Sequence, residues 1–380
     1  MEVSEPVVAS LEILALACLV ATAAPWSRST YWWVRVWDFP RPQHAVLAAA
    51  VAAALIGLAR ASPTVYGLVV LLALAAAYHV AVILPYSPMW RPQLLPSPAP
   101  AGSRSLSLLI ANVLIENRHA DRLLALIREN DPDLILAVET DEWWAARLDE
   151  LADKYQHAVA YPLANTYGMI LRSRLPLEAA EVRFLLHKEI PSIRAGVKLR
   201  SGERVRLYSV HPEPPSPTEA ESSLGRDAEL VIIGREVAKA NEPAIVAGDL
   251  NDVGWSRTSH LFRRLSRLLD PRIGRGLFCT FHAGWPLIRW PLDHVFASAD
   301  FLLRDIRRLP TFGSDHFPIF IALDYAPKAV AAHEPPEPDH ADLVEARETV
   351  VDAKAAIAAG SLGPAAPQLL WPLSAGPSGG

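Results

Sequence analysis

The chain has 380 residues, of which 51% are hydrophobic and 20% charged, and its formal net charge is -5 at pH 7. This composition excludes a wholly disordered chain, and so mild a charge offers no electrostatic argument for nucleic-acid binding. Two cysteines, Cys18 and Cys279, exclude a disulfide framework and a cysteine-rich metal site. The length leaves room for more than one ordinary domain.

Three apolar stretches predict membrane-spanning helices near residues 7–24, 45–59 and 65–84, within a membrane region of residues 1–86. A helix needs about 20 apolar residues to cross a hydrocarbon core of about 30 Å. The first stretch has a signal peptide as its alternative, which the absence of a positive charge before it opposes. Three buried helices of a soluble domain are the other alternative, and the length and continuity of the stretches oppose it.

The loop between the first two stretches, residues 25–43, is rich in tryptophan and arginine, as is typical of a membrane interface. Three passes would put this loop on the same side of the membrane as everything after residue 84. We therefore expect it to lie beside the domain that follows. Its three arginines, against the single Arg60 in the next loop, favour the cytoplasm by the positive-inside rule.

Composition divides the rest of the chain into three parts. Residues 87–103 are proline-rich and predict an extended linker leaving the bilayer. Residues 104–325 have the length and apolar content of a folded domain. Residues 326–380 are rich in alanine, proline and glycine and predict a mostly disordered tail, in which only residues 341–359 have a helical pattern.

Short apolar runs alternate with helical patterns within the folded domain. The predicted strands are residues 106–113, 134–139, 167–172, 196–199, 204–211, 244–248, 292–297 and 317–323. The predicted helices are residues 120–130, 220–240 and 256–269. Because some apolar strands follow one another without a helix between them, the pattern favours a mixed α/β sandwich with helices covering two packed sheets.

Polar residues recur at the ends of these apolar strands. The set consists of Asn112, Glu139, His211, Asp249, Asn251, Asp293, Asp315 and His316. One such residue is usually a solvated strand end. The same feature at five strand ends or loops indicates a site, because the sites of open sheets lie beyond the strand ends.

The segment GDLND places Asp249 and Asn251 on one face, since side chains alternate along an extended chain. A carboxylate beside an amide could orient a water and hold a phosphoryl oxygen, and an Asx-rich turn is the simpler alternative. Glu139 could bind a hard cation such as Mg²⁺ or merely begin a helix. His316 beside Asp315 could be a carboxylate-supported imidazolium, although an Asp-His pair is common.

Taken in order, these motifs resemble the endonuclease/exonuclease/phosphatase (DNase I-like) superfamily. The matching pieces are Asn112 in the opening strand and the motifs DPDLILAVE, YGMILRSRLPL, SVHPEPP, IVAGDLND, PLDHVFAS and GSDHFPIFIAL. They cover essentially all of residues 104–325. The resemblance implies a four-layer α/β sandwich, here preceded by about three transmembrane helices as in a membrane-anchored bacterial group of the superfamily.

The resemblance also implies a magnesium ion, or a manganese ion, and a role for each residue. Glu139 would be the principal metal ligand, with Asn112 and Asp315 assisting. Asp249 would orient or deprotonate the attacking water, and Asn251 would bind the phosphate, as would Asn112.

His316, paired with Asp293, would stabilise charge in the transition state. His211 matches a histidine of the DNase-like and lipid-phosphatase branches. Abasic-site endonucleases carry an acid where this chain has Leu114, which argues against that branch.

We therefore expect a membrane-anchored, metal-dependent phosphoesterase that hydrolyses a phosphodiester, phosphomonoester or pyrophosphate of a lipid-type substrate. Tethering favours lipids, because it presents them at high effective concentration. The alternatives are a membrane-tethered endonuclease or exonuclease acting on DNA, and a catalytically inactive binding module. The arginine-rich residues 257–275 fit either phosphate binding or a solvated helix face.

We expect a multi-pass protein of the cell membrane whose partners are the bilayer and a phosphorylated lipid. The arrangement of the membrane-anchored group favours an extracytoplasmic domain over the cytoplasmic side that the arginines indicate, and we adopt it as the prediction. The sequence leaves the oligomeric state open.

Overall fold

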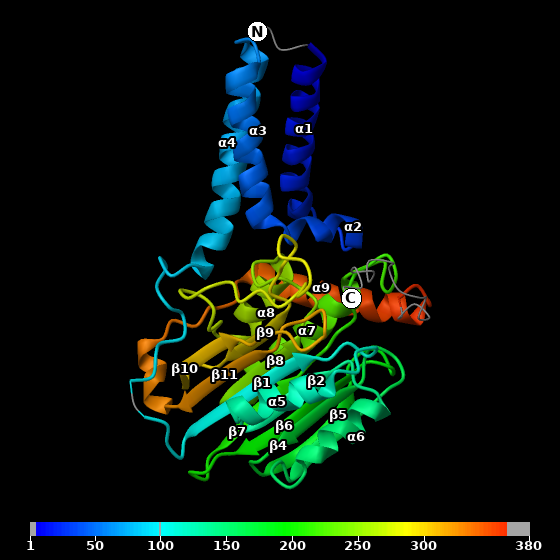
Figure 1. Cartoon of the computed structure of the whole chain (residues 1–380), viewed down its shortest axis with the longest axis vertical. Coiled ribbons are helices and arrows are strands. Elements are labelled where there is room, and N and C mark those ends of the chain that lie inside the picture. Colours follow the sequence, from blue (N-terminus) through cyan, green and yellow to red (C-terminus); the bar gives the residue numbers. More distant parts are fainter. Residues whose placement is uncertain (1–4, 99, 363–380) are drawn as a thin grey trace, which may run out of the picture.

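In the computed structural model, which describes residues 5–98 and 100–362, three long helices stand on an α/β domain (Figure 1). They are α1 (Glu5–Ala23), α3 (Arg41–Leu58) and α4 (Pro63–Ile83), close to the predicted bounds. All three are long and apolar enough to cross a membrane, and most of each apolar stretch is exposed rather than packed against protein. A water-facing bundle would not expose so much apolar surface, so this finding opposes the buried-helix alternative.

The helices pack on one another through a narrow seam that includes Ala15, Ala48 and Leu72. Small residues at such a seam allow close approach of the backbones, as in membrane helix bundles. α4 begins at a defined point, because the Ser62 side chain accepts a hydrogen bond from the Val65 N–H at 3.2 Å and Pro63 occupies the first turn.

Two mixed sheets form the centre of the domain. The six-stranded sheet has the order β10-β11-β1-β2-β4-β3, with bounds Phe301–Arg308, Ile319–Tyr325, Ser105–Asn112, Leu134–Val138, Met169–Ser173 and His157–Tyr161. The five-stranded sheet has the order β5-β6-β7-β8-β9, with bounds Leu177–Phe184, Pro191–Lys198, Arg204–Ser209, Ala244–Asp249 and Asp293–Ala297.

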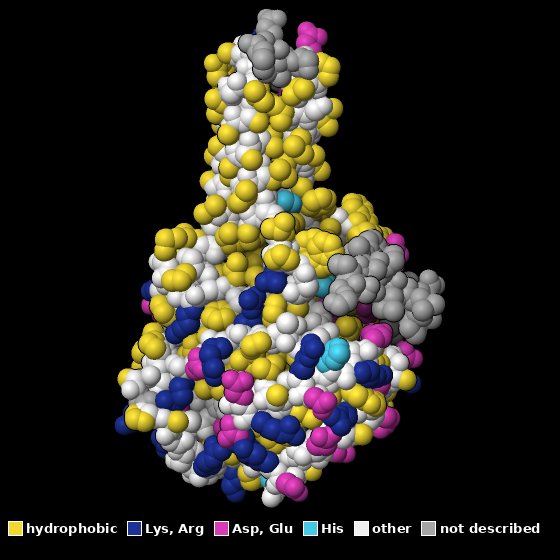
Figure 2. Space-filling view, in the orientation of Figure 1, with side chains coloured by type: hydrophobic (Ala, Val, Ile, Leu, Met, Phe, Trp, Pro, Cys, Tyr) yellow, Lys and Arg dark blue, Asp and Glu magenta, His cyan; other side chains and the backbone are white. Residues whose placement is uncertain are grey.

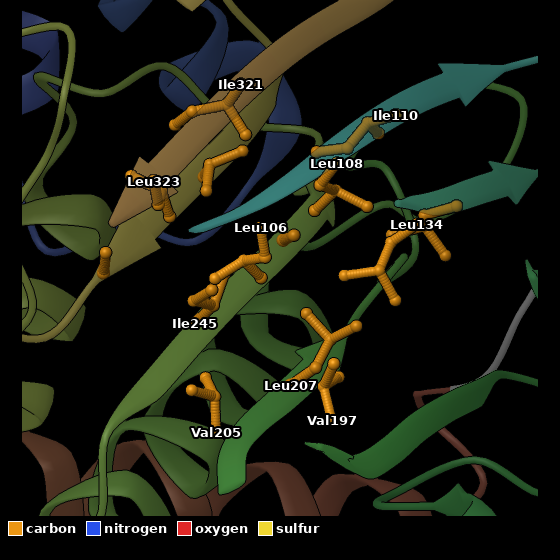
Figure 3. Packing of buried hydrophobic residues seen from close by; sticks show 14 of the residues in the cluster. Leu106, Leu108, Ile110, Leu134, Val197, Val205, Leu207, Ile245, Ile321 and Leu323 are labelled. Carbon is orange, nitrogen blue, oxygen red and sulfur yellow. The ribbon is translucent and has the colours of Figure 1, made fainter. Parts of the chain in front are cut away.

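The main core lies between the sheets, where Leu106, Leu108 and Ile110 of β1 face Leu207 and Ile245 of the other sheet (Figure 3). Because these β1 residues alternate, the intervening ones face outward. Helices α5 (Ala120–Asn130) and α6 (Glu142–Leu148) cover the outer face of the first sheet. Helices α7 (Leu224–Ala240) and α8 (Arg257–Ser266) cover that of the second. The four-layer α/β sandwich is therefore confirmed.

Three strands were not predicted, and all three lie at sheet edges: β3 and β10 at the two ends of the first sheet, and β5 at one end of the second. Edge strands have one solvated side and do not need continuous apolar runs. β3 alternates between half-buried and exposed residues, and no residue of β5 is buried. The short helix α6 was also missed. Short 3-10 helices occupy Ala24–Trp26, Val36–Asp38, Leu84–Tyr86, Asp149–Leu151 and Pro327–Ala332.

The proline-rich linker, which we expected to be an extended spacer leaving the bilayer, packs along the domain. Leu94 is fully buried, and Ser97 N–H donates to the Leu303 carbonyl at 2.7 Å while Leu303 N–H donates to the Leu95 carbonyl at 2.8 Å. The linker thus extends the edge of the first sheet, because β10 offers unpaired backbone groups there. The domain consequently lies directly beneath the helices.

The segment after β11 also differs from the expected disorder over residues 326–362. The predicted helix is present as α9 (His340–Ala358), which has a capping box at Asp339 and packs on α7 and α8. Arg264 and Asp342 form a bidentate ion pair with both distances at 2.6 Å. Pairing with the arginines of α8 orders the segment, and residues 363–380 lie outside the described residues.

The loop between α1 and α3 lies against the domain, as expected. It includes the short helix α2 (Trp32–Arg35). Trp32 N–H donates to the Glu221 carbonyl at 3.0 Å, and Ser223 N–H donates to the Thr30 carbonyl at 2.7 Å. The Trp255 indole donates to the Asp38 carbonyl at 2.8 Å. Backbone contacts of this kind hold the loop in one position on the domain.

Candidate active site

The strand register brings the predicted polar residues to one edge of the sandwich. β1 and β2 are parallel, so Asn112 and the end of β2 lie together. β9 is antiparallel to β8, and Asp249 pairs with Asp293. β11 is antiparallel to β1, so the segment before it, with His316, returns to the same edge. Residues far apart in the chain thus meet in one buried site.

Asn112 joins two carboxylates at the centre of this site. Its amide nitrogen donates to Glu139 at 2.7 Å and to Asp249 at 3.1 Å, while its oxygen accepts from the Leu114 N–H at 3.0 Å. The amide therefore bridges the two sheets. In this arrangement Asn112 directs its nitrogen, not its oxygen, at the carboxylates of the site.

His316 lies between two carboxylates on the other side of Asp249. Its Nδ1 is 2.8 Å from Asp293, and its Nε2 is 3.6 Å from Asp249. Burial alone would lower the pKa of His316, but Asp293 and Asp249 raise it well above its ordinary value. His316 is therefore an imidazolium near neutral pH, with both N–H groups directed at carboxylates.

The same interactions act on the two carboxylates. Burial would raise the pKa of Asp249, but the charges of His316 and His211 bring it below the ordinary value. Burial raises the pKa of Asp293, and the attraction of His316 offsets only part of that rise. Asp249 is therefore the ionised base of the group.

Unusual backbone conformations at the strand ends orient these side chains toward the site. Glu139 and Asn251 have φ angles of 60° and 51°, in the left-handed region that costs energy for residues with a side chain. Gly248 has φ 147°, and a Cβ there would lie 1.9 Å from the Val210 carbonyl oxygen. Only glycine fits, so β7 and β8 can approach closely just before Asp249.

Asn251 lies beside Asp249 and is held from two sides. Its N–H donates to Asp249 at 2.9 Å, and its side-chain amide donates to the Pro212 carbonyl at 3.0 Å. The buried Arg226 donates to the Asn251 carbonyl at 2.7 Å and pairs with Asp227. Sequence reasoning missed Arg226, because an arginine in a helical pattern normally indicates a solvated face.

His211 and Asp315 complete the predicted set. His211 is buried, which lowers its pKa, and its Nδ1 has no hydrogen-bond partner among the described residues. Asp315 is half-buried and accepts weakly from the Ser314 hydroxyl at 3.4 Å. Its charge raises the pKa of Glu139. All eight predicted residues therefore lie at this edge.

Two further residues were not foreseen. The Ser314 hydroxyl donates to the Asn112 carbonyl at 2.8 Å and accepts from the His316 N–H at 3.0 Å, so it fixes both residues. The Phe281 ring lies 5.1 Å from the His316 ring and covers it. GSDHF could have pointed to Ser314, whereas nothing local to Phe281 indicates its position.

The donor set fits a divalent cation. Burial, followed by repulsion from Asp315, raises the pKa of Glu139 to about 8, so the site lacks a positive charge there. Carboxylates without a cation are the ligands that Mg²⁺ and similar ions prefer. Asp249, Asp293 and His316 form a second group whose ligand atoms lie within 4.8 Å of one another, but the imidazolium already supplies its positive charge.

Comparison with known proteins identifies the family of the chain. Residues 109–316 match the endonuclease/exonuclease/phosphatase family. No protein with a curated description matches the sequence at a significant level.

Solved structures of this family's fold superpose on the domain. The structure of D. rerio TDP2 complexed with single strand DNA product is 17% identical, covers 58% of this chain and 99% of its own, and has a TM-score of 0.50. An endonuclease/exonuclease/phosphatase from Beutenbergia cavernae DSM 12333 is 19% identical over 59% of this chain and 72% of its own, with a TM-score of 0.48. Sphingomyelinase C from Streptomyces griseocarneus is 15% identical over 57% of this chain and 99% of its own, with a TM-score of 0.44.

Proposed function

Because the chain belongs to the endonuclease/exonuclease/phosphatase family, whose members are metal-dependent phosphoester hydrolases, we propose that it is a membrane-anchored phosphoesterase acting on a lipid-type phosphate. The reaction is in-line attack of water on phosphorus, which needs a base, neutralised phosphoryl oxygens and a stabilised leaving group.

Asp249 orients the water and takes its proton, since it is the ionised base of the site. His316 stabilises charge on the phosphoryl group or on the departing oxygen, and Asp293 keeps it protonated. Asn251 positions the phosphate, Asn112 holds the Glu139 and Asp249 carboxylates in place, and the unpartnered Nδ1 of His211 is a further donor or acceptor for the phosphate. Losing one positioned donor of this kind typically costs about 10²–10³ in rate.

Glu139 would hold the cation, with Asp315 beside it, because burial and the charge of Asp315 raise the pKa of Glu139 and a bound cation would favour its ionised form. Mg²⁺ is the proposed ion, and Mn²⁺ is the alternative with similar ligand preferences. When bound, such an ion neutralises phosphoryl oxygens as a Lewis acid.

One observation carries the lipid assignment: the loops that build the catalytic edge are the same loops that meet the membrane segment. Trp255, six residues after Asp249, donates to the Asp38 carbonyl, and Trp290 packs on Phe39 at 5.6 Å between ring centroids. Trp290 also stacks on Phe281, which covers His316. These contacts connect the site loops with the membrane segment, which favours a phosphate presented at the bilayer surface over a DNA duplex.

The test uses the full chain in lipid nanodiscs with Mg²⁺. Phosphate release from prenyl pyrophosphates and phospholipids is compared with plasmid nicking, using Asp249→Ala and, as matched control, the exposed Asp153→Ala. Lipid-phosphate turnover lost only in Asp249→Ala supports the proposal. Nicking without lipid turnover, falling steeply as salt is raised, identifies a tethered nuclease instead.

We also propose that the domain faces the extracytoplasmic side. Alkaline phosphatase fused to the C-terminus of the full chain should be active in cells. An inactive fusion together with an active cytoplasmic reporter at the same point would contradict this orientation.

A further inference from the structure

A groove of about 770 Å³ lies beside the base of α3, and none of the eight predicted site residues lines it. One wall is the first turn of α3, with Pro42 and Gln43. The opposite walls are the segment from Leu277 to Arg289 and the end of β10 up to Pro310. The groove therefore opens where the polypeptide enters the predicted membrane span.

Three arginines line the groove, namely Arg289, Arg307 and Arg308, and no acidic residue among those described lines it. Arg289 donates to the Ala283 carbonyl at 2.9 Å, and Arg308 donates to the Cys279 carbonyl at 2.9 Å. Among the described residues neither forms an ion pair with a carboxylate. Arg307 alone has one, with Asp305 at 2.6 Å. The groove therefore carries a net positive charge, because only one of its three arginines is paired with a carboxylate in the described part of the chain.

The remaining lining is apolar, with Leu277, Phe278 and Pro286 among its members. Beside it the side chains of Trp285, Leu287 and Ile288 are exposed, and the Gln43 side chain donates to the Leu287 carbonyl at 2.9 Å. This hydrogen bond ties the exposed apolar loop to the start of α3. Figure 2 shows hydrophobic side chains surrounding the base of the helices, with Lys and Arg side chains just beneath them.

We propose that the groove binds the phosphate headgroup of an anionic lipid of the surrounding bilayer. Arginine suits this ligand, because its planar fork donates to phosphate oxygens in pairs. The apolar walls and the exposed loop suit the upper part of the acyl chains, and the groove lies beside the first turn of α3, where the predicted membrane span begins. The site rests on the proposed membrane anchorage but not on the proposed reaction, since none of its arginines belongs to the catalytic centre.

The test measures lipid retention by the full chain in a neutral detergent, using native mass spectrometry with added phosphatidylglycerol or phosphatidylcholine. The wild type should retain more phosphatidylglycerol than phosphatidylcholine. Losing each arginine should weaken retention about fivefold, the usual contribution of one basic residue near an anionic surface. Arg289→Gln/Arg308→Gln should therefore lose most of the preference, while Arg128→Gln, exposed on α5, should leave it unchanged.

Because Arg289 and Arg308 also brace the main chain, Arg307→Gln serves as a second variant that leaves those bonds intact. It should weaken retention about fivefold without changing the thermal melting of the protein. Equal retention of both lipids by the wild type, or unchanged retention in both variants, overturns the proposal. Displacement of phosphatidylglycerol by an equal concentration of inorganic phosphate would also overturn it, because the site would then bind free phosphate.

Discussion

The two halves of the catalytic edge differ in how their charge is balanced. On one side, His316 lies between Asp293 and Asp249, and the imidazolium compensates the carboxylates. On the other, burial and then the charge of Asp315 raise the pKa of Glu139, and the Asn112 hydrogen bond and the charge of His316 offset only part of that rise. The first half balances its charge with protein groups, whereas the carboxylates of the second are ligands of the kind that a divalent cation prefers. Burial raises carboxyl pKa values in both halves, but the imidazolium reverses that rise at Asp249, whereas the charge of Asp315 adds to it at Glu139.

The largest effect should come from removing the imidazolium that balances the charges of Asp293 and Asp249. His316→Gln removes the imidazolium and should lower kcat by about 10²–10³-fold, because a positioned charge donor is lost. The Mg²⁺ concentration giving half-maximal activity should change little, since Glu139 is untouched. Steady-state hydrolysis of a soluble phosphodiester by the full chain measures both. A large shift in Mg²⁺ dependence would place the metal with His316 instead.

A substitution of Glu139 should instead alter the dependence of activity on the metal ion. Glu139→Gln should raise the Mg²⁺ concentration needed for half-maximal activity by about 10–100-fold, a range known for weakened metal sites. Removal of divalent ions with a chelator should abolish activity, and Mg²⁺ or Mn²⁺ should restore it. A matched change at exposed Glu150 should do nothing. Unaltered Mg²⁺ dependence in Glu139→Gln would refute the assignment of this carboxylate to the metal.

A smaller effect should appear in the pH profile. The charged form of His316 is lost as pH rises through its pKa, which Asp293 helps to hold well above the ordinary value. Asp293→Asn should therefore move the alkaline limb of the kcat profile to lower pH, with roughly 25-fold lower activity at pH 8 than at pH 6 if the pKa returns toward about 6.5. The wild type should stay active at pH 8. Identical pH profiles of kcat for the wild type and Asp293→Asn would mean that ionisation of His316 does not control the rate-limiting step.

The smallest effect should come from a buried carboxyl that has no role in metal binding. Burial raises the pKa of Glu229 in α7 to about 8, but this carboxyl lies outside the predicted catalytic set. Its unfolded form loses the proton near pH 4.5 and its folded form only near pH 8, so its contribution to stability falls as pH rises between these values. Glu229→Gln should raise the free energy of unfolding by about 1–3 kcal/mol at pH 8, and by much less at pH 5.

Thermal melting at the two pH values checks this prediction, with hydrolysis of the same soluble substrate as the second readout. Activity should be unchanged, in contrast to Glu139→Gln. Equal melting shifts at pH 5 and pH 8 would mean that packing, not ionisation, is responsible.

Residue patterns alone predicted most of the central strands, the three long apolar helices and eight of the polar residues that meet at the candidate site, although not Ser314 or Arg226. Central strands such as β2 are buried on both faces and therefore appear as continuous apolar runs. The polar residues stand out because each directly follows or precedes such a run. The edge strands β3, β5 and β10 gave no such pattern, since half of their surface is solvated.

Local periodicity and residue type were enough to predict the fold class and the chemical groups of the site. How those groups pair became visible only in the folded chain: Asn112 bonds both Glu139 and Asp249, and Arg226 bonds the Asn251 carbonyl. It also decided that the linker and α9 pack on the domain. These outcomes depend on distances between segments remote in the chain, which strand register and helix packing set and which no local pattern encodes.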